Sequence, residues 1–192
     1  GAAVNAVLTL SSGIDADLAS ATVADAATDG FTIDASGNAA ASTVVGSDGD
    51  DIITGGNVGD NITGGAGDDT FNIDAGTDTI TDLSGSDVLN VGNGAIANAA
   101  VTENFTATAG TQNLGGAAEN AVLTLGSGVD VDLESATVAD PATDGFTINA
   151  SGNADESTIK GSAGDDIITA GDDGDMVYGG AGADTITGGE DS

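Results

Sequence analysis

The chain has 192 residues, with 32 Asp and Glu against a single Lys or Arg, a formal net charge of −31, and neither Cys nor His. Without Cys and His, the chain cannot form a disulfide, a thiolate or imidazole metal site, or a Ser-His-Asp triad. The negative charge repels nucleic acid and anionic membrane surfaces, so cations are the expected partners. No apolar stretch is long enough to predict a transmembrane helix, and we expect no membrane insertion.

The apolar composition points in two directions. Aromatic residues make up only 3% of the chain, and acidic chains with few aromatic residues are usually disordered. Yet 39% of the residues are hydrophobic, and Ile, Val and Leu recur in short strand-like groups. We therefore predict a fold that needs an external cation before it can close.

Residues 1–45 contain short β signals separated by Gly, Ser, Asn and Asp turns. They predict strands at Val7 to Leu10, Leu18 to Val23, Phe31 to Ile33 and Thr43 to Val45. Helix signals are nearly absent from the chain.

Residues 46–90 consist of five consecutive nonapeptides, GSDGDDIIT, GGNVGDNIT, GGAGDDTFN, IDAGTDTIT and DLSGSDVLN. The sixth position of every repeat is an aspartate: Asp51, Asp60, Asp69, Asp78 and Asp87. The eighth position is always large and apolar: Ile53, Ile62, Phe71, Ile80 and Leu89. The apolar series extends one step earlier, to Val44.

This spacing predicts an architecture. The last three positions of each repeat form a short strand with the eighth residue pointing inward, and the Gly-rich half forms a turn. Two repeats then make one coil of about 18 residues, and successive coils stack as parallel strands about 4.8 Å apart. The predicted fold is all-β, a right-handed parallel β-solenoid.

Residues 91–115, rich in Ala, Asn and Thr, lead into a long duplication in which Gly1 aligns with Gly116, an offset of 115. We therefore predict a first module over 1–115 and a second, shorter one over 116–192. Within the second, 116–160 corresponds to 1–45, and 161–192 holds a second nonapeptide run with Asp166, Asp175 and Asp184. The incomplete repeat at 188–192 suggests a segment of a longer, modular protein.

Stacked coils bring the sixth-position aspartates of alternate repeats together. Carboxylates about 4.8 Å apart repel by roughly 0.9 kcal/mol even in water. A hard cation with oxygen ligands removes this cost, and calcium suits a flexible all-oxygen site better than magnesium does. The predicted calcium ligands are the eight aspartates, in four bridged pairs with Asp175 left over: Asp51–Asp69, Asp60–Asp78, Asp69–Asp87 and Asp166–Asp184.

The repeat GGxGxDxUx, clearest at Gly64 to Asn72 and at Gly179 to Thr187, resembles that of the RTX (hemolysin-type) calcium-binding β-roll family. The resemblance covers 46–90 and 161–192 and implies β-roll segments that bind several calcium ions. Members occur in secreted toxins, proteases, adhesins and surface-layer proteins. Departures from the motif include Val58, Ile73, Asp82, Ala170 and Asp173.

Other interpretations have less support. No Gly-Lys-Ser/Thr follows the Gly-rich turns, so a phosphate cradle is not predicted. Carboxylate pairs of the glycosidase kind lack aromatic sugar platforms. Outward Thr and Asn could form ligand-binding or ice-binding rows, but Ile52, Val88, Met176 and Tyr178 interrupt them.

The sequence therefore predicts a structural protein rather than an enzyme. We expect a calcium-stabilised module of a secreted, self-assembling surface-layer, fibre or adhesin protein at the cell surface. Its partners would be calcium and copies of itself or adjoining modules. The alternative is a folding and secretion module attached to an enzyme or toxin whose active domain lies elsewhere.

Overall fold

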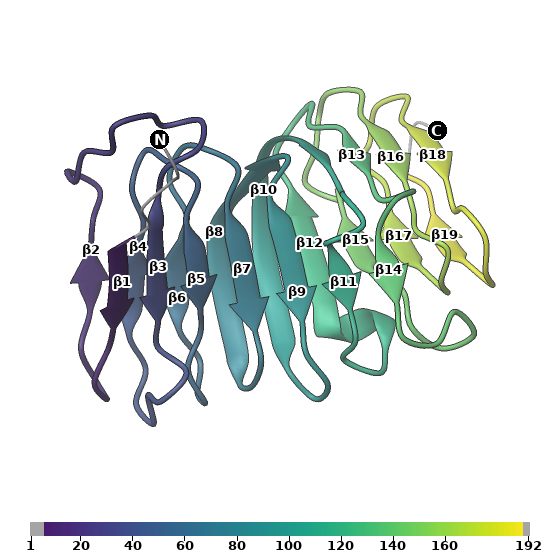
Figure 1. The fold of residues 1–192 in the computed structure, drawn as a ribbon. Coiled ribbons are helices and arrows are strands. Elements are labelled where there is room, and N and C mark those ends of the chain that lie inside the picture. The colour runs from purple at the N-terminus through teal and green to yellow at the C-terminus, as the bar shows by residue number, and fades with distance from the viewer. Residues whose placement is uncertain (1–5, 190–192) are drawn as a thin grey trace.

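A computed structural model of the protein describes residues 6–189, except for the Glu119 side chain (Figure 1). In the first module the strands are β1 (Ala6–Thr9), β2 (Ala16–Asp17), β3 (Phe31–Asp34), β4 (Thr43–Val45), β5 (Ile52–Thr54), β6 (Asn61–Thr63), β7 (Thr70–Ile73), β8 (Thr77–Gly85), β9 (Val88–Val91), β10 (Ile96–Thr106) and β11 (Gln112–Asn113). A short 3-10 helix, η1 (Ala118–Asn120), comes next. The strands of the second module are β12 (Ala121–Leu125), β13 (Val131–Asp132), β14 (Thr137–Val138), β15 (Thr147–Asn149), β16 (Thr158–Lys160), β17 (Ile167–Thr169), β18 (Met176–Tyr178) and β19 (Thr185–Thr187).

The strands form two parallel sheets. One has the order β1-β3-β5-β7-β9-β11-β14, and the other has the order β19-β17-β15-β12-β10-β8-β6-β4-β2. Odd and even strands of the first module therefore stack in separate columns, which is the topology of a solenoid (Figure 1). The prediction of an all-β, parallel β-solenoid is confirmed.

The nine-residue period sets the register inside the rolls. Ile53 lies opposite Phe71, and Ile62 lies opposite Ile80, so each coil takes two nonapeptides as predicted. Within β5, Ile53 is completely buried, whereas its neighbour Ile52 is 38% exposed. The eighth-position residues of both columns thus meet in a narrow core between the sheets.

The N-terminal region differs from one detail of the prediction. The strand expected over Leu18 to Val23 is wrong, because the chain turns there and the strand is β2. The Asp17 carboxylate accepts a hydrogen bond from the Ala19 backbone N–H at 3.0 Å, and Ala21 N–H bonds back to Leu18 O at 2.7 Å. A local Asp side chain therefore closes a turn that competes with the strand.

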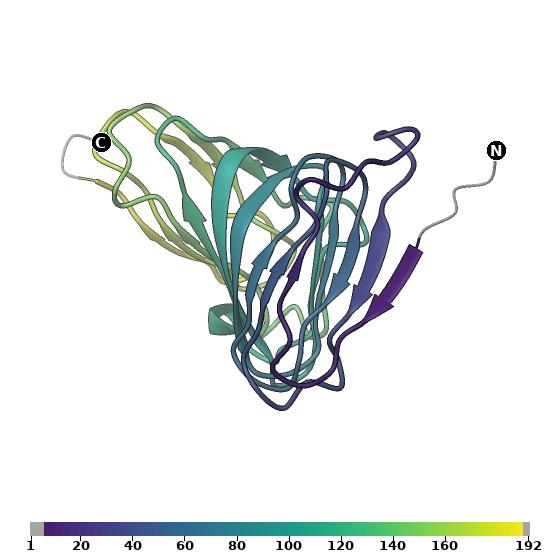
Figure 2. The same cartoon turned by 90° about the vertical axis from the view of Figure 1, so that its left-hand side faces the viewer.

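The longest strand, β10, joins the two rolls. The first half of β10 pairs with β12 and its end pairs with β13, so two columns of strands of the second roll begin on this one strand. The two rolls diverge from this point (Figure 2). No Gly-rich turn interrupts β10 between Ile96 and Thr106, which allows its unusual length.

One set of strands changes sheet at this junction. β12, β15, β17 and β19 are the sequence counterparts of β1, β3, β5 and β7, because the modules are offset by 115 residues. However, they continue the twelve-stranded sheet, which holds the even strands of the first module. The counterparts of β2, β4 and β6, which are β13, β16 and β18, belong to the same sheet and join it at the end of β10.

Candidate metal centre

The sixth-position aspartates connect successive coils. The backbone N–H of one such aspartate donates to the Oδ1 atom of the aspartate one coil further on. The distances are 2.8 Å for Asp51 to Asp69, Asp60 to Asp78 and Asp69 to Asp87, and 3.0 Å for Asp166 to Asp184. The structure therefore brings together every pair that the sequence predicted.

The second carboxylate oxygen usually turns back to its own repeat. Oδ2 accepts the N–H of the residue in the second position of the repeat, at distances of 2.5 to 2.7 Å. These bonds run from Ser47 to Asp51, Gly56 to Asp60, Ser162 to Asp166 and Gly171 to Asp175. Six of the eight aspartates are buried, and Asp175 and Asp184 are partly exposed.

Burial disfavours the charged form of these carboxylates when no cation is beside them. Loss of solvent, together with the neighbouring Asp87, Asp51 and Asp82 charges, raises the pKa of Asp69 to about 8 against the opposing hydrogen bond from Asp51 N–H. Burial likewise raises the pKa of Asp78 and of Asp87 to about 7. The pKa of Asp166 rises to about 6 for the same reason.

Asp78 has an oxygen that is left without a partner. Its Oδ2 atom is buried and accepts no hydrogen bond, because Ile73 and Asp74 replace the glycines of its repeat and no second-position N–H reaches it. A buried carboxylate oxygen in this state favours a cation beside it.

Backbone carbonyls complete the set of oxygen donors. A Cβ atom built on Gly46 would overlap both Gly64 O of the next coil and the Asp51 carboxylate, and one built on Gly65 would overlap Ser47 O. Gly65 has φ +113°, a conformation that favours glycine. The turns are thus lined by carboxylate and carbonyl oxygens, the ligands that calcium takes. Within residues 6–189, no three acidic side chains converge on one point.

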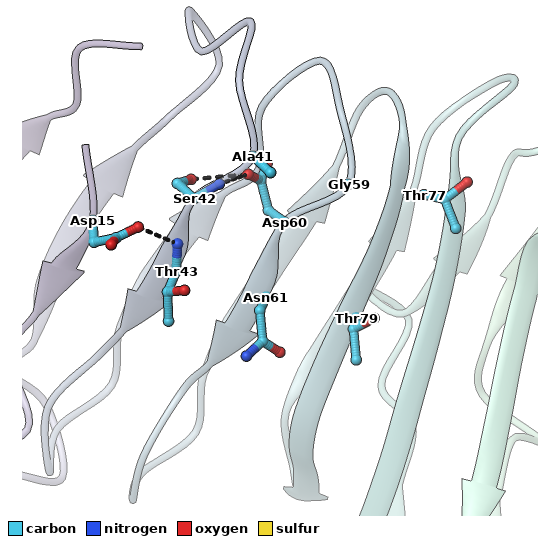
Figure 3. A pocket seen from close by; sticks show the side chains of 9 residues that line it. All are labelled: Asp15, Ala41, Ser42, Thr43, Gly59, Asp60, Asn61, Thr77 and Thr79. Atoms are coloured by element: carbon cyan, nitrogen blue, oxygen red, sulfur yellow. Dashed lines mark hydrogen bonds between the residues drawn. The ribbon is translucent and has the colours of Figure 1, made fainter. Parts of the chain in front are cut away.

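One nonapeptide was missed by the sequence analysis. Residues 37–45 (GNAAASTVV) keep the frame, with Ser42 in the sixth position and Asn38 in the second. Ser42 donates to Asp60 Oδ1 through its N–H at 2.7 Å and its hydroxyl at 2.8 Å (Figure 3). The signal was the nine-residue step from Val44 to Ile53, which fixes the frame even without Asp.

The second module repeats this arrangement. Ser157 donates its N–H to Asp175 Oδ1 at 2.8 Å, and the Asn153 side chain contacts the Ser157 hydroxyl at 3.4 Å. A neutral Ser in the sixth position thus supplies hydrogen bonds to the first aspartate of its column. Each roll begins on a repeat that lacks the sixth-position charge.

Asp82, which replaces the first Gly of its repeat, has a role that the motif does not predict. Its carboxylate accepts hydrogen bonds from Gly64 N–H at 3.0 Å and from Gly65 N–H at 2.8 Å. Asp82 therefore takes the donor that would otherwise serve Asp69. The extra negative charge also lies close enough to raise the pKa of both Asp69 and Asp87.

Stacked turns lined by carboxylates and carbonyls define a calcium-binding β-roll. The sequence matches the model of the RTX calcium-binding nonapeptide repeat at residues 36–71, 45–80, 72–95, 151–186 and 169–192. These segments cover more than half of the chain, which therefore belongs to this family. Its repeats bind several Ca²⁺ ions. Neither the curated proteins nor the solved structures include a match.

The buried carboxylates of the described turns have no basic side chain beside them. The chain's only Lys or Arg, Lys160, lies on β16 and pairs with Asp132 at 2.8 Å, away from the turns. In the described range, no helix is long and apolar enough to cross a membrane.

Proposed function

We propose that the eight sixth-position aspartates are the calcium ligands of this chain. They would act in the pairs Asp51–Asp69, Asp60–Asp78, Asp69–Asp87 and Asp166–Asp184, with Asp175 at the end of its column. The hydrogen bonds between successive coils support this pairing, since they hold each carboxylate against the preceding turn. Turn carbonyls would fill the remaining coordination positions.

We further propose that the chain is a calcium-stabilised structural module of a secreted bacterial surface-layer, fibre or adhesin protein. The observation that carries this proposal is the burial of like-charged carboxylates in stacked turns, which makes folding depend on an external cation. At low cytosolic calcium, charge repulsion keeps the chain loose, and outside the cell it closes into a stiff rod. The 1–115 and 116–192 modules would be successive units of that rod.

Circular dichroism during a calcium titration tests the coupling of folding to binding. We expect strand signal to appear with calcium and to disappear with a chelator. Calorimetry on the same sample gives the number of ions and their affinity. A chain that folds fully in chelator would contradict the proposal.

A second candidate function is a folding and secretion module beside an enzyme or toxin domain, which membership of the family also supports. The two candidates differ in assembly. A structural module forms fibres or sheets when calcium is added, as electron microscopy and light scattering would show. A chain that folds with calcium but stays monomeric at high concentration favours the secretion module.

A further inference from the structure

The two modules differ in one local and chemically distinctive way. Lys160, Met176 and Tyr178 stand where the first module has Val45, Asn61 and Thr63. They are the only Lys, the only Met and the only Tyr of the whole chain. All three lie on β16 and β18, next to each other in one sheet.

These side chains share the outer face of that sheet. Lys160 lies opposite Tyr178 in the register of β16 and β18, and Asp132 of β13 lies opposite Lys160 on the other side. Ile159, between Thr158 and Lys160, is completely buried, so its neighbours along β16 point outward. Tyr178 is 51% exposed, and its hydroxyl donates to Met176 Sδ at 3.0 Å. The face formed by β13, β16 and β18 thus presents an aromatic ring, and we call it the tyrosine face.

A polar hollow lies on the same face, and Lys160, the register partner of Tyr178, is one of its lining residues. Asn104, Asp130, Asp132 and Thr158 also line it. Asp130 is fixed there by Thr158 N–H, which donates to Oδ1 at 2.6 Å, and by its own N–H, which donates to Asn104 Oδ1 at 2.9 Å. The hollow therefore offers held hydrogen-bond donors and acceptors next to a flat apolar surface.

The charge of Lys160 is neutralised locally. Its Nζ atom donates to Asp132 Oδ2 at 2.8 Å and lies 3.7 Å from Glu134 Oε2. Lys160 is thus already paired with two carboxylates, and the chain as a whole carries −31, so an anionic ligand gains nothing here. The ligand that fits is neutral and polar.

We propose that the tyrosine face is a binding site for a neutral glycan. A sugar ring has an apolar C–H face, which stacks on Tyr178, and a rim of hydroxyls, which both donate and accept hydrogen bonds. Lys160 and Asn104 supply donors to that rim, and the carboxylate of Asp132 supplies acceptors. This site is separate from the calcium turns and extends the structural role to adhesion.

The aromatic content of the face favours a glycan over a protein partner. Tyr178 is the only aromatic residue of β13, β16 and β18, and one ring suffices to stack on one sugar ring. A stable protein interface is richer in such side chains and buries about 800 Å² on each partner.

The first module supplies an internal comparison. A hollow there is lined by Asp15, Thr43 and Asp60 among others, and only Asp15 and Thr43 match lining positions of the second-module hollow. Asp15 Oδ1 accepts from Thr43 N–H at 2.7 Å, as Asp130 does from Thr158 (Figure 3). However, Thr63 occupies the position of the ring. The Asp–Thr hydrogen bond is thus common to both modules, and the aromatic ring is particular to the second.

Intrinsic fluorescence tests the proposal directly, because Tyr178 is the only Tyr and the chain has no Trp. Cellohexaose, chitohexaose and maltohexaose are each titrated into the calcium-saturated protein. We expect at least one to give a saturable change in tyrosine emission, with calorimetry giving the same dissociation constant. No saturable change with any of the three overturns the proposal, and so does equal binding of polygalacturonate, an acidic polymer.

Variants then locate the site. Replacing Lys160, Met176 and Tyr178 by Val, Asn and Thr installs the residues that the first module accommodates at these positions, so the fold should persist. Calorimetry should show at least a tenfold loss of affinity for the bound oligosaccharide, with unchanged calcium-dependent circular dichroism. Wild-type affinity in this triple variant overturns the proposal. Because calcium-dependent folding is measured separately, failure here is distinguishable from failure of the structural role.

Discussion

Most of the sixth-position aspartates hold two parts of the backbone at once. Asp51 accepts Ser47 N–H from its own turn and Phe31 N–H from the coil before it, the latter at 2.6 Å. These bonds shape the turn before any cation is considered. Their cost is a buried charge, and calcium offsets that cost.

Replacing Asp69 by Asn should therefore cost more than replacing Asp87, because Asp69 takes part in two proposed bridges and Asp87 in one. At a calcium concentration 100 times the dissociation constant, each lost site removes about 2.7 kcal/mol of stability. Calorimetric site counts and urea unfolding in calcium measure both effects. The neighbouring exposed Asp68→Asn is the control, and equal losses at Asp69 and Asp87 would argue against the bridging scheme.

The raised pKa values also predict how the metal-free chain responds to pH. Since the folded state raises the pKa of Asp69 to about 8 and of Asp78 to about 7, it binds protons more tightly than the unfolded state does. Stability in chelator should then fall as the pH rises from about 4 to about 8. Circular dichroism in chelator should show more strand at pH 5 than at pH 8, and the opposite order would contradict the burial of these groups.

At the level of strands, the nine-residue period determines which residues of each strand point into the core. Ile53→Ala should cost about 2 to 5 kcal/mol because it opens a cavity in the core between the sheets. The adjacent Ile52→Ala, on the outer face of the same strand, should cost well under about 1.5 kcal/mol. Denaturant unfolding at saturating calcium compares them, and similar losses would mean that the register of β5 is wrong.

The sequence predicts the strands well where Gly-rich turns separate them at regular intervals. The positions of Asp51, Ile53 and their equivalents follow from the period alone, as does the coil of two repeats. The motif does not predict Ser42, because it requires a carboxylate in the sixth position. The Ser42 N–H donates to the next coil as the aspartate N–H groups do, and its hydroxyl adds a second hydrogen bond to Asp60. The sequence does not predict the length of β10, because this length depends on pairing with three other strands that are distant in sequence.

For the whole molecule, β10 is the shared element of the two rolls. Ala99 pairs with Ile80 of the first roll and with Leu123 of the second. Ala99→Pro removes a ladder N–H at this junction and should uncouple the rolls. We expect one thermal transition in calcium-saturated wild type and two in the variant.

Scanning calorimetry measures this coupling, and limited proteolysis should then cut near β10. The exposed Asn98→Ala, one residue earlier on the same strand, is the control. Two transitions already present in the wild type would show that the rolls unfold independently.

The shared strand β10 has a consequence for symmetry. The counterparts of β1 and β2, which belong to different sheets in the first module, are β12 and β13, and both of these pair with β10 in one sheet. The 115-residue duplication of the sequence is therefore not a simple translation of the structure. Residues that are equivalent in the two copies face different neighbours, so the same side chain meets two environments in one molecule.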